Sequence, residues 1–332
     1  MIILLAALAV PASRAFAGRM EPAAVANSSA LLRSAQQDFR AGNYSSAIAT
    51  LRSLVSEDSA NAEAFYWLGR CYYEIRDVDQ AIAHAQKSVS LAPANSVYEQ
   101  WLARDYGAKA DRDRSYFAAR KTKKHLEKAV ALDPANVSAR RDLAEFCAQA
   151  PWSVGGSTDE AITQIDAIAK IDPVAGRLAR ASFDVNALKR TDLADAEYKQ
   201  ILAAKAKDPQ PYFDALVFYQ EQNRPADMKV FLDAVARVDA NDPRIAFYRA
   251  AAMIMTGTNL DRAAGYLKSY LAGTPDRSDW PTHAAAREWL GRAYEIQGRP
   301  LQAAEQYRAS LQLDPGRTTA QERLEKLEKK SL

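Results

Sequence analysis

Few residues of this chain have the types and spacing that catalysis or metal binding requires. The three histidines, His84, His125 and His283, lie far apart, and none has a Cys, Asp or Glu at the spacing of metal ligands. Metalloprotease, serine-hydrolase and Walker phosphate-binding motifs are missing from the sequence. A catalytic site among acidic residues of the irregular middle is the alternative to simple solvation of a turn: Asp184, Asp192 and Asp195. The sequence therefore predicts a protein that is not an enzyme and that holds neither a metal nor another cofactor.

One Gly-rich turn has two interpretations. Gly155-Gly156-Ser157-Thr158 precedes an expected helix, so its backbone N–H groups could bind an anion. The favoured interpretation is that Ser157 or Thr158 caps this helix. Trp152, in the same turn, is expected to cover the interface between two of the repeated helical units described below. A ligand-facing role is the alternative.

The elements that must position these residues follow a repeated pattern, which is clearest in Ala62–Asn95. Its large and small residues recur at helical spacing: Phe65, Leu68, Gly69, Tyr72, Ala81, Ala85 and Pro93. Because Gly69 and Ala81 have little bulk, two helices can approach closely where they cross. Similar segments follow along the chain, each closed by a proline that ends its second helix: Pro93, Pro134, Pro173, Pro209, Pro243, Pro275 and Pro315.

This pattern closely resembles the tetratricopeptide repeat (TPR), a helix–turn–helix unit of about 34 residues. The resemblance is strongest in the second and eighth units and weakest in the fifth and sixth. It implies an all-α, right-handed α-solenoid of about eight TPR units over residues 28–317. A polar helix in residues 318–332 is expected to cap the open end of the array.

The resemblance also implies a binding surface, because the first helices of TPR units line a concave groove in which peptides dock. Placed in the register of Ala62–Asn95, the residues expected to face this groove and bind a partner are Phe39, Arg40, Tyr66, Arg70, Tyr73, Arg104 and Arg141. Tyr and Arg dominate the binding energy of many interfaces, and the Arg fork suits carboxylates. The alternative is that these aromatic side chains only pack between helices. Glu74, Gln100 and Glu145 are expected on the same face, and weaker candidates continue it farther along the chain: Phe213, Tyr248, Met255, Glu288 and Arg292.

The resemblance favours a scaffold that binds a protein or peptide partner, whose identity the sequence does not encode. The Lys and Asn with which one TPR subclass grips a C-terminal carboxylate are missing at matching positions. A glycan- or peptidoglycan-binding module, with sugars stacked on the aromatic groove, is the alternative. The sequence leaves the oligomeric state open.

Nucleic acid is not an expected partner. The net charge of +3 is small for a chain of 332 residues. A basic run lies on an expected second helix: Arg120, Lys121, Lys123, Lys124 and Lys128. Nucleic-acid binding would require aromatic residues interleaved with these charges, and Phe117 alone does not supply them. The run is therefore interpreted as a solvated face.

The first residues resemble a secretory leader. An apolar run, Ile2–Val10, is followed by Ala15-Phe16-Ala17, whose small residues match a cleavage site before Gly18. The run is too short to span a bilayer. No Lys or Arg precedes it, so either the true start lies upstream or the segment is not a signal. We expect residues 1–17 to be a signal peptide, 18–27 a flexible lead-in, and the protein to be periplasmic or extracellular without a membrane span.

The two cysteines, Cys71 and Cys147, fall on first helices that are two units apart. Packed helices are roughly 8–10 Å apart, whereas a disulfide requires Cα atoms within about 7 Å. We therefore expect two free, largely buried thiols.

Overall fold

The computed structural model describes residues 22–277 and 279–330. Within these residues the chain is an all-α solenoid without β-strands, as predicted. The first four helix pairs are α1 (Pro22–Arg40) with α2 (Tyr44–Glu57), α3 (Ala62–Glu74) with α4 (Val78–Leu91), α5 (Ser96–Asp113) with α6 (Tyr116–Leu132), and α7 (Val137–Gln149) with α8 (Thr158–Ile171). A short 3₁₀ turn, η1 (Trp152–Val154), precedes α8.

The second half continues in the same way. The next four pairs are α9 (Pro173–Asn186) with α10 (Thr191–Ala204), α11 (Gln210–Glu221) with α12 (Pro225–Val238), α13 (Arg244–Thr256) with α14 (Leu260–Gly273), and α15 (His283–Ile296) with α16 (Pro300–Leu313). The last helix, α17 (Thr318–Lys330), lies where the sequence predicts a terminal helix. The expected signal peptide, residues 1–17, lies outside the described residues. Residues 22–27 belong to α1, so this part of the expected flexible lead-in is helical.

The same capping device starts several first helices. The side chains of Asn61, Asn95 and Asn136 each accept a hydrogen bond from a backbone N–H in the first turn of the helix that follows. Each Asn comes just after the break that ends the preceding unit, so it satisfies a backbone donor that the new helix leaves unpaired. The local sequence thereby sets where each unit begins.

Small residues allow the two helices of a unit to cross closely, as the sequence predicts. A Cβ atom on Gly69 would lie 3.3 Å from the carbonyl oxygen of Ala81. On Gly291 of α15, it would lie 2.6 Å from the ring of Tyr307 on α16. Both glycines therefore lie at helix crossings.

The core is a chain of apolar clusters, each shared by neighbouring units. The clusters extend over residues 35–81, 78–118, 103–183 and 181–320. The last is the largest and includes units five and six, whose repeat pattern is the weakest. Cys71 and Cys147 are free and buried in these clusters, as predicted. Burial raises the pKa of both thiols to about 12, so both stay protonated.

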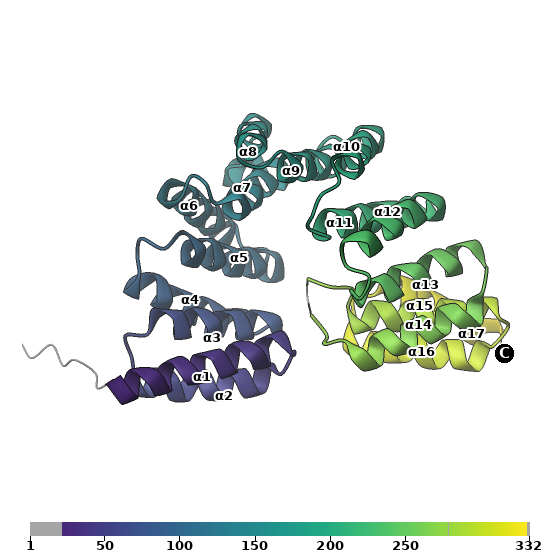
Figure 1. The fold of residues 1–332 in the computed structure, drawn as a ribbon, viewed down its shortest axis with the longest axis horizontal. Coiled ribbons are helices and arrows are strands. Elements are labelled where there is room, and N and C mark those ends of the chain that lie inside the picture. Colours follow the sequence, from purple (N-terminus) through teal and green to yellow (C-terminus); the bar gives the residue numbers. More distant parts are fainter. Residues whose placement is uncertain (1–21, 278, 331–332) are drawn as a thin grey trace, which may run out of the picture.

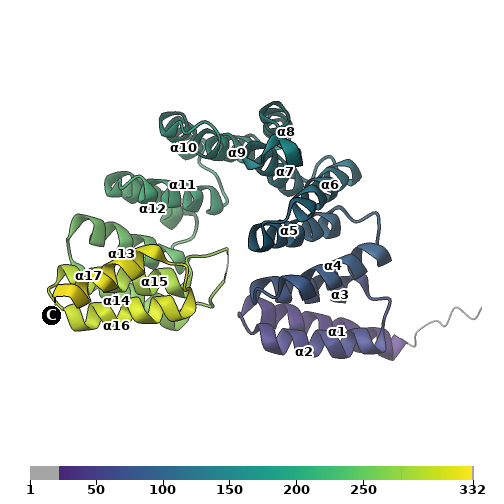
Figure 2. The ribbon, with the colours of Figure 1, turned by 180° about the vertical axis from the view of Figure 1, so that it is seen from behind.

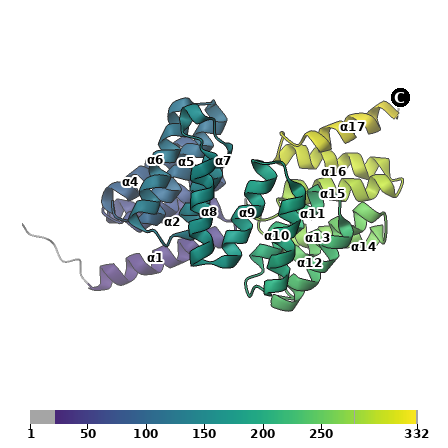
Figure 3. The same cartoon turned by 90° about the horizontal axis from the view of Figure 1, so that it is seen from above.

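The units follow an arc, which Figures 1 and 2 show from opposite sides. Seen from above, α1 and α17 lie at opposite ends of the molecule (Figure 3). The loop between α14 and α15 lies in the gap between the two arms of the arc (Figure 1). There the Tyr44 hydroxyl donates to the backbone oxygen of Asp276 at 3.3 Å, and a Cβ on Gly42 would be 3.0 Å from the Cβ of Pro275. The first unit thus touches the loop that leads into the eighth.

The Gly-rich turn before α8 has the expected cap. The Ser157 side chain accepts a hydrogen bond from the backbone N–H of Glu160 at 3.2 Å. The N–H groups of Gly155, Gly156 and Ser157 already donate to backbone oxygens within the turn and α7, which leaves them unavailable to an anion. The expectation for Trp152 is wrong: its side chain is 87% exposed and covers no repeat interface. Val154 fills the interior of the turn instead.

Candidate functional site

The first helices of the units form the inner layer of the arc. Each of them contacts the first helix of the next unit, from α1 and α3 through to α13 and α15. In Figure 1, α5, α7, α9 and α11 lie nearer the centre of the arc than α6, α8, α10 and α12. We call this surface the inner wall. It is the surface on which the sequence places the partner-binding residues.

Four of the predicted residues, Tyr66, Arg70, Tyr73 and Arg104, lie together on the inner wall. They join two rings that we did not single out from the sequence, Tyr98 and Trp101. The ring of Tyr66 stacks on that of Tyr98 with centroids 5.0 Å apart, and Tyr73 meets Trp101 edge-on at 5.8 Å. We call these six residues the aromatic–arginine cluster: Tyr66, Arg70, Tyr73, Tyr98, Trp101 and Arg104.

Arg70 lies at the centre of this cluster. Its guanidinium carbon is 3.8 Å from the ring centroid of Trp101 and 4.8 Å from that of Phe39. In the described part of the chain its only hydrogen bond is from Nη1 to the Tyr66 hydroxyl, at 3.0 Å. Its Nε is buried and has no hydrogen-bond partner. Arg70 is therefore a half-buried cation that is held by rings and is not neutralised by a bonded carboxylate.

Arg104 is held differently. Its Nε and Nη2 donate to the two carboxylate oxygens of Asp142 on α7, at 2.6 and 3.1 Å. Gln100 donates to the same carboxylate at 2.8 Å. The guanidinium carbon of Arg104 is 4.6 Å from the ring centroid of Trp101. This two-point pair fixes Arg104 and links the third unit to the fourth.

A buried acid lies close to both arginines. Asp105 is 1% exposed, and its Oδ1 has no hydrogen-bond partner. Burial raises the pKa of the Asp105 carboxyl well above its usual range, and the opposing charges of Arg70 and Arg104 offset only part of this. A buried N–H donor of the cluster, Arg70 Nε, and a buried oxygen of the neighbouring Asp105 therefore both lack a hydrogen-bond partner.

The remaining predicted residues lie outside the cluster or are covered. Phe39 was expected to face the groove, which is wrong: it is 7% exposed, because Tyr44, Trp67 and Arg70 pack around its ring. Arg40 is exposed at the end of α1.

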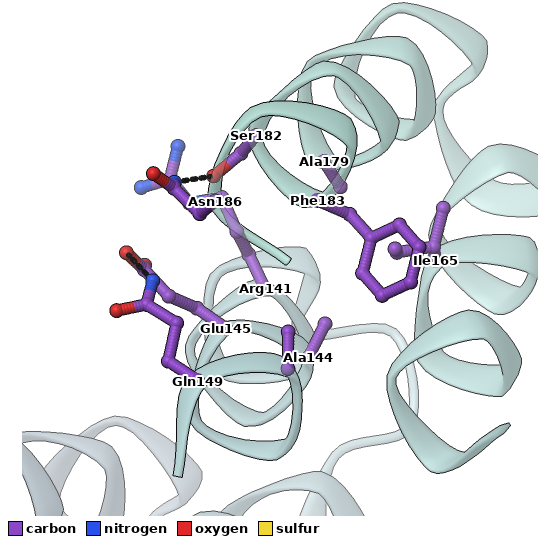
Figure 4. Close-up of a pocket in the computed structure, with 10 residues that line it drawn as sticks. Arg141, Ala144, Glu145, Gln149, Ile165, Ala179, Ser182, Phe183 and Asn186 are labelled. Atoms are coloured by element: carbon purple, nitrogen blue, oxygen red, sulfur yellow. Dashed lines mark hydrogen bonds between the residues drawn. The ribbon is translucent and has the colours of Figure 1, made fainter. Parts of the chain in front are cut away.

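Arg141 is exposed on α7, where it lines a small cavity with Glu145, Gln149 and residues of α9 (Figure 4). This cavity has a volume of about 20 Å³, with Phe183 and Ile165 among its lining residues. It has room for about one water molecule.

A larger cavity lies on the inner wall of the sixth and seventh units. It has a volume of about 250 Å³ and is lined by Phe213, Tyr248 and Trp280, among others. Phe213 and Tyr248 were expected to be exposed, but they are 2% and 5% exposed and form the floor of this cavity. Glu288, another expected groove residue, is also buried, with Arg317 as its partner.

The arginine of this second cavity is fully paired. Arg244 lies 3.7 Å from the ring centroid of Phe213, a stacking geometry similar to that of Arg70 on Trp101. It also pairs with Asp242 at 2.7 Å and donates to Gln210 at 2.7 Å. Its charge is therefore already neutralised, in contrast to that of Arg70.

The histidines all have structural contacts. His84 stacks on Phe65 and Tyr72, His125 bonds to Glu99, and His283 bonds to the backbone oxygen of Thr274. The described residues contain no group of three or more potential metal ligands. No described helix is both long and apolar enough to cross a membrane.

The sequence contains a signal for Trp101 and Tyr98 when the second and third units are aligned with each other. Trp67-Leu68 and Trp101-Leu102 occupy the same place in the second and third units, and Tyr66 and Tyr98 lie close to these pairs in sequence. Aligning unit against unit would have shown that the rings of one unit meet those of the next. The expected exposure of residues within a single unit does not contain this signal.

Comparison with known proteins supports the repeat assignment. A family model described as tetratricopeptide repeat matches residues 32–96 and 255–318. These two segments are thus similar to tetratricopeptide repeats, and the described residues fold as an all-α solenoid. No curated protein matches the sequence.

Solved structures of similar fold include a chain of the APC/C hetero-tetramer Cut9–Hcn1, at 14% identity and a TM-score of 0.51. The match covers 90% of this protein and 55% of that chain, so the protein spans about half of its length. A tetratricopeptide repeat protein from Parabacteroides merdae matches at 14% identity and a TM-score of 0.43, over 91% of this protein and 98% of that chain. A TPR protein from Thermus thermophilus matches at 20% identity and a TM-score of 0.45, over 53% of this protein and 90% of that chain. The first of these likenesses shows the fold alone.

Proposed function

We propose that the protein is a non-enzymatic scaffold that binds a protein or peptide partner on its inner wall, with the aromatic–arginine cluster as the contact site. The observation that supports this most is Arg70. A half-buried guanidinium without a bonded carboxylate, framed by aromatic rings, matches a carboxylate or backbone oxygen supplied by a partner. A hydrogen bond to a charged group contributes about 1.5–3 kcal/mol, so a partner oxygen that accepts from the accessible part of this guanidinium would gain affinity.

The cluster suits a peptide better than a sugar. A sugar binds an aromatic residue by stacking on the ring, but the ring of Trp101 already contacts the guanidinium groups of Arg70 and Arg104. Tyr66 and Tyr98 stack on each other. A glycan would therefore have to compete with these contacts for the faces of the rings. Failure of the protein to bind isolated peptidoglycan would agree with this preference.

The binding test compares two matched arginines. Trp-Leu-Gly-Arg occurs at residues 67–70 and again at 289–292, so Arg292 in the eighth unit is the counterpart of Arg70. We expect Tyr66→Ala/Arg70→Ala to lose partners that the wild type recovers from cell-envelope extracts, and Arg292→Ala to retain them. Circular dichroism checks that each variant is folded. Equal recovery of every partner by all three proteins would refute the proposed site.

We also propose that the protein is exported and acts in the cell envelope. The apolar run and the Ala15-Phe16-Ala17 sequence support this. We expect N-terminal sequencing of the protein from its native source to start at Gly18. Uncleaved protein in the cytosol would overturn the location and leave the binding proposal untouched.

A further inference from the structure

Exposed aromatic side chains lie in two places of the outer layer: at the start of α6 in the third unit and in the turn before α8 in the fourth. Phe117, at the start of α6, is 80% exposed, and Trp152, in η1, is 87% exposed. Tyr116 is 45% exposed and links the two: its ring meets that of Phe117 edge-on with centroids 6.0 Å apart, and its hydroxyl bonds to Ser153, next to Trp152. Large exposed apolar groups that lie together commonly mark an interaction site or a membrane contact.

The turn that carries Trp152 is held firmly against α6. The Tyr116 hydroxyl donates to the backbone oxygen of Ser153 at 2.5 Å. Lys123 donates to the backbone oxygen of Gly155 at 2.8 Å and to the Glu160 carboxylate at 2.7 Å. Because α6 holds the turn at Ser153 and Gly155 and is tied to α8 through Glu160, the exposure of Trp152 belongs to the folded structure.

The two glycines of the turn are required for this geometry. Gly155 has a φ of +103°, and a Cβ there would lie 2.6 Å from the side chain of Lys123. A Cβ on Gly156 would lie 1.7 Å from the backbone oxygen of Ala150. Val154 is buried inside the turn while Trp152 faces outwards. The turn therefore buries the small apolar side chain of Val154 and exposes the much larger one of Trp152.

Cations without an ionic partner lie on and next to the exposed face of α6 that carries Phe117. Phe117, Arg120 and Lys124 follow an i, i+3, i+7 spacing, so they share one exposed face of α6. The guanidinium carbon of Arg120 lies 5.9 Å from the ring centroid of Tyr116. Arg114, just before α6, is exposed as well. In the described part of the chain, none of these three cations forms an ion pair with an acid.

We infer that this aromatic–basic patch, formed by Tyr116, Phe117, Trp152, Arg114, Arg120 and Lys124, docks the protein on a phospholipid bilayer with anionic headgroups. Aromatic side chains enter the interfacial layer of a membrane, and cations bind its negative surface. The rings protrude and have no protein wall around them. A protein partner would have to place its pockets and acids opposite these particular rings and cations. An anionic bilayer offers an apolar interface and negative headgroups at every position.

The location of the patch leaves the inner wall free. Phe117 and Trp152 belong to α6 and η1 in the outer layer, whereas the aromatic–arginine cluster belongs to α3 and α5. Figure 1 shows α6 outside α5 in the arc. A membrane-bound protein could therefore still present its inner wall to a partner. This inference is independent of what the inner wall binds.

The test measures binding of the full chain to vesicles. We expect flotation with vesicles of phosphatidylcholine and phosphatidylglycerol, and none with phosphatidylcholine alone. Phe117→Ser/Trp152→Ser removes the rings, and Arg120→Glu/Lys124→Glu reverses the charge. Since each Lys or Arg near an anionic surface contributes about a fivefold factor in partitioning, we expect a loss of at least about tenfold in the charge variant. Added salt should weaken wild-type binding.

Leu301→Ser is the matched control, because Leu301 is 86% exposed on α16, far from the patch in sequence. We expect it to bind vesicles like the wild type. Circular dichroism checks the fold of every variant. Equal binding by wild type and both patch variants, or no wild-type binding, would overturn the inference. Two other results would also overturn the inference if the wild type does not bind vesicles. Binding to polyglutamate that both patch variants lose would assign the patch to an acidic segment. Self-association that both patch variants lose would assign it to a second copy of the chain.

Discussion

The second and eighth units contain the same four residues, Trp-Leu-Gly-Arg, yet their arginines have different surroundings. The guanidinium carbon of Arg70 lies nearest a ring of the next unit, 3.8 Å from the centroid of Trp101 on α5, and 5.4 Å from Trp67 of its own unit. Arg292 lies 3.8 Å from Trp289 of its own unit. The difference comes from the helix that follows each unit. Helix α5 places aromatic rings beside Arg70. The eighth unit is followed by the polar terminal helix α17, which brings cations: Arg323 on α17 and Arg317 just before it.

Those cations neutralise the acids of the eighth unit. Arg317 pairs with Glu288 at 2.7 Å, and Arg323 pairs with Glu295 at 2.9 Å. Burial and the charge of Arg323 lower the pKa of Arg292. In the second unit, by contrast, the nearby acid Asp105 has one oxygen without a partner. The comparison indicates that an identical motif becomes a closed end in one place and a candidate binding site in the other.

The largest effect should come from breaking the closed end. Arg317→Ala leaves Glu288, which is 5% exposed, without its ionic partner. Removing one member of such a buried pair should destabilise the fold by about 3 kcal/mol. Denaturant unfolding and hydrogen exchange in α17 measure this. The added change Glu288→Gln should restore part of the loss, and an unchanged unfolding midpoint in Arg317→Ala would contradict the prediction.

The two glycines of the motif should respond differently to the same change. In Gly291→Ala the new methyl group would meet the buried ring of Tyr307 at 2.6 Å, so we expect destabilisation of about 1–3 kcal/mol. In Gly69→Ala the contact is 3.3 Å, and the helix propensity of Ala contributes up to about 1 kcal/mol. Gly69→Ala should therefore be nearly neutral. Thermal unfolding of both variants checks the order, and equal losses would show that the two crossings are equally tight.

Asp105 should make the open site sensitive to pH. Because its pKa is raised in the folded protein, ionising this carboxyl costs free energy in the folded state. Stability is lost as pH rises above the unfolded pKa of about 4, until the folded pKa is passed. We expect Asp105→Asn to be more stable than wild type at neutral pH, because the amide does not ionise at this buried position.

The control for this prediction is the same comparison in acid. The advantage of Asp105→Asn should shrink as pH falls towards the unfolded pKa, because both proteins are then neutral at this position. Unfolding midpoints measured across the range decide the question. A constant difference at every pH would show that the carboxyl does not titrate as predicted.

The smallest effect should come from the contact between the two arms of the arc. Tyr44→Phe removes the hydrogen bond to Asp276, a partly exposed bond of 3.3 Å. We expect a loss of about 0.5 kcal/mol, because exposed hydrogen bonds exchange readily with water. Hydrogen exchange around Gly42 and Pro275 should increase. A loss as large as that of Arg317→Ala would mean that the whole arc depends on this contact.

Much of the local structure could be predicted from the sequence. The spacing of Leu68, Gly69 and Tyr72 predicts the packed face of a helix and its crossing point, and both are confirmed. Ser157 caps its helix, and Cys71 and Cys147 are free and buried, as expected. These features depend on residues within one unit or on its immediate neighbours, so the pattern of one repeat is sufficient to predict them.

The wrong predictions concern contacts between units. Phe39 looked exposed on its own helix, but rings of α2 and α3 and the side chain of Arg70 cover it. Trp152 looked like a packing residue, yet the hydrogen bonds of its turn hold it in solvent. Exposure is set by the neighbours of a side chain, and a single helical register does not contain those neighbours.

The sequence by itself determined the kind of molecule: a series of helix pairs whose apolar faces must be covered by the next pair. Only the tertiary structure decided that Trp101 meets Arg70, that Tyr44 reaches Asp276 across the arc, and that Tyr116 contacts both Phe117 and the turn of Trp152. The physical reason is distance along the chain. Local spacing sets the helices and their small-residue crossings, whereas the small rotation between successive units accumulates into an arc and brings distant residues together.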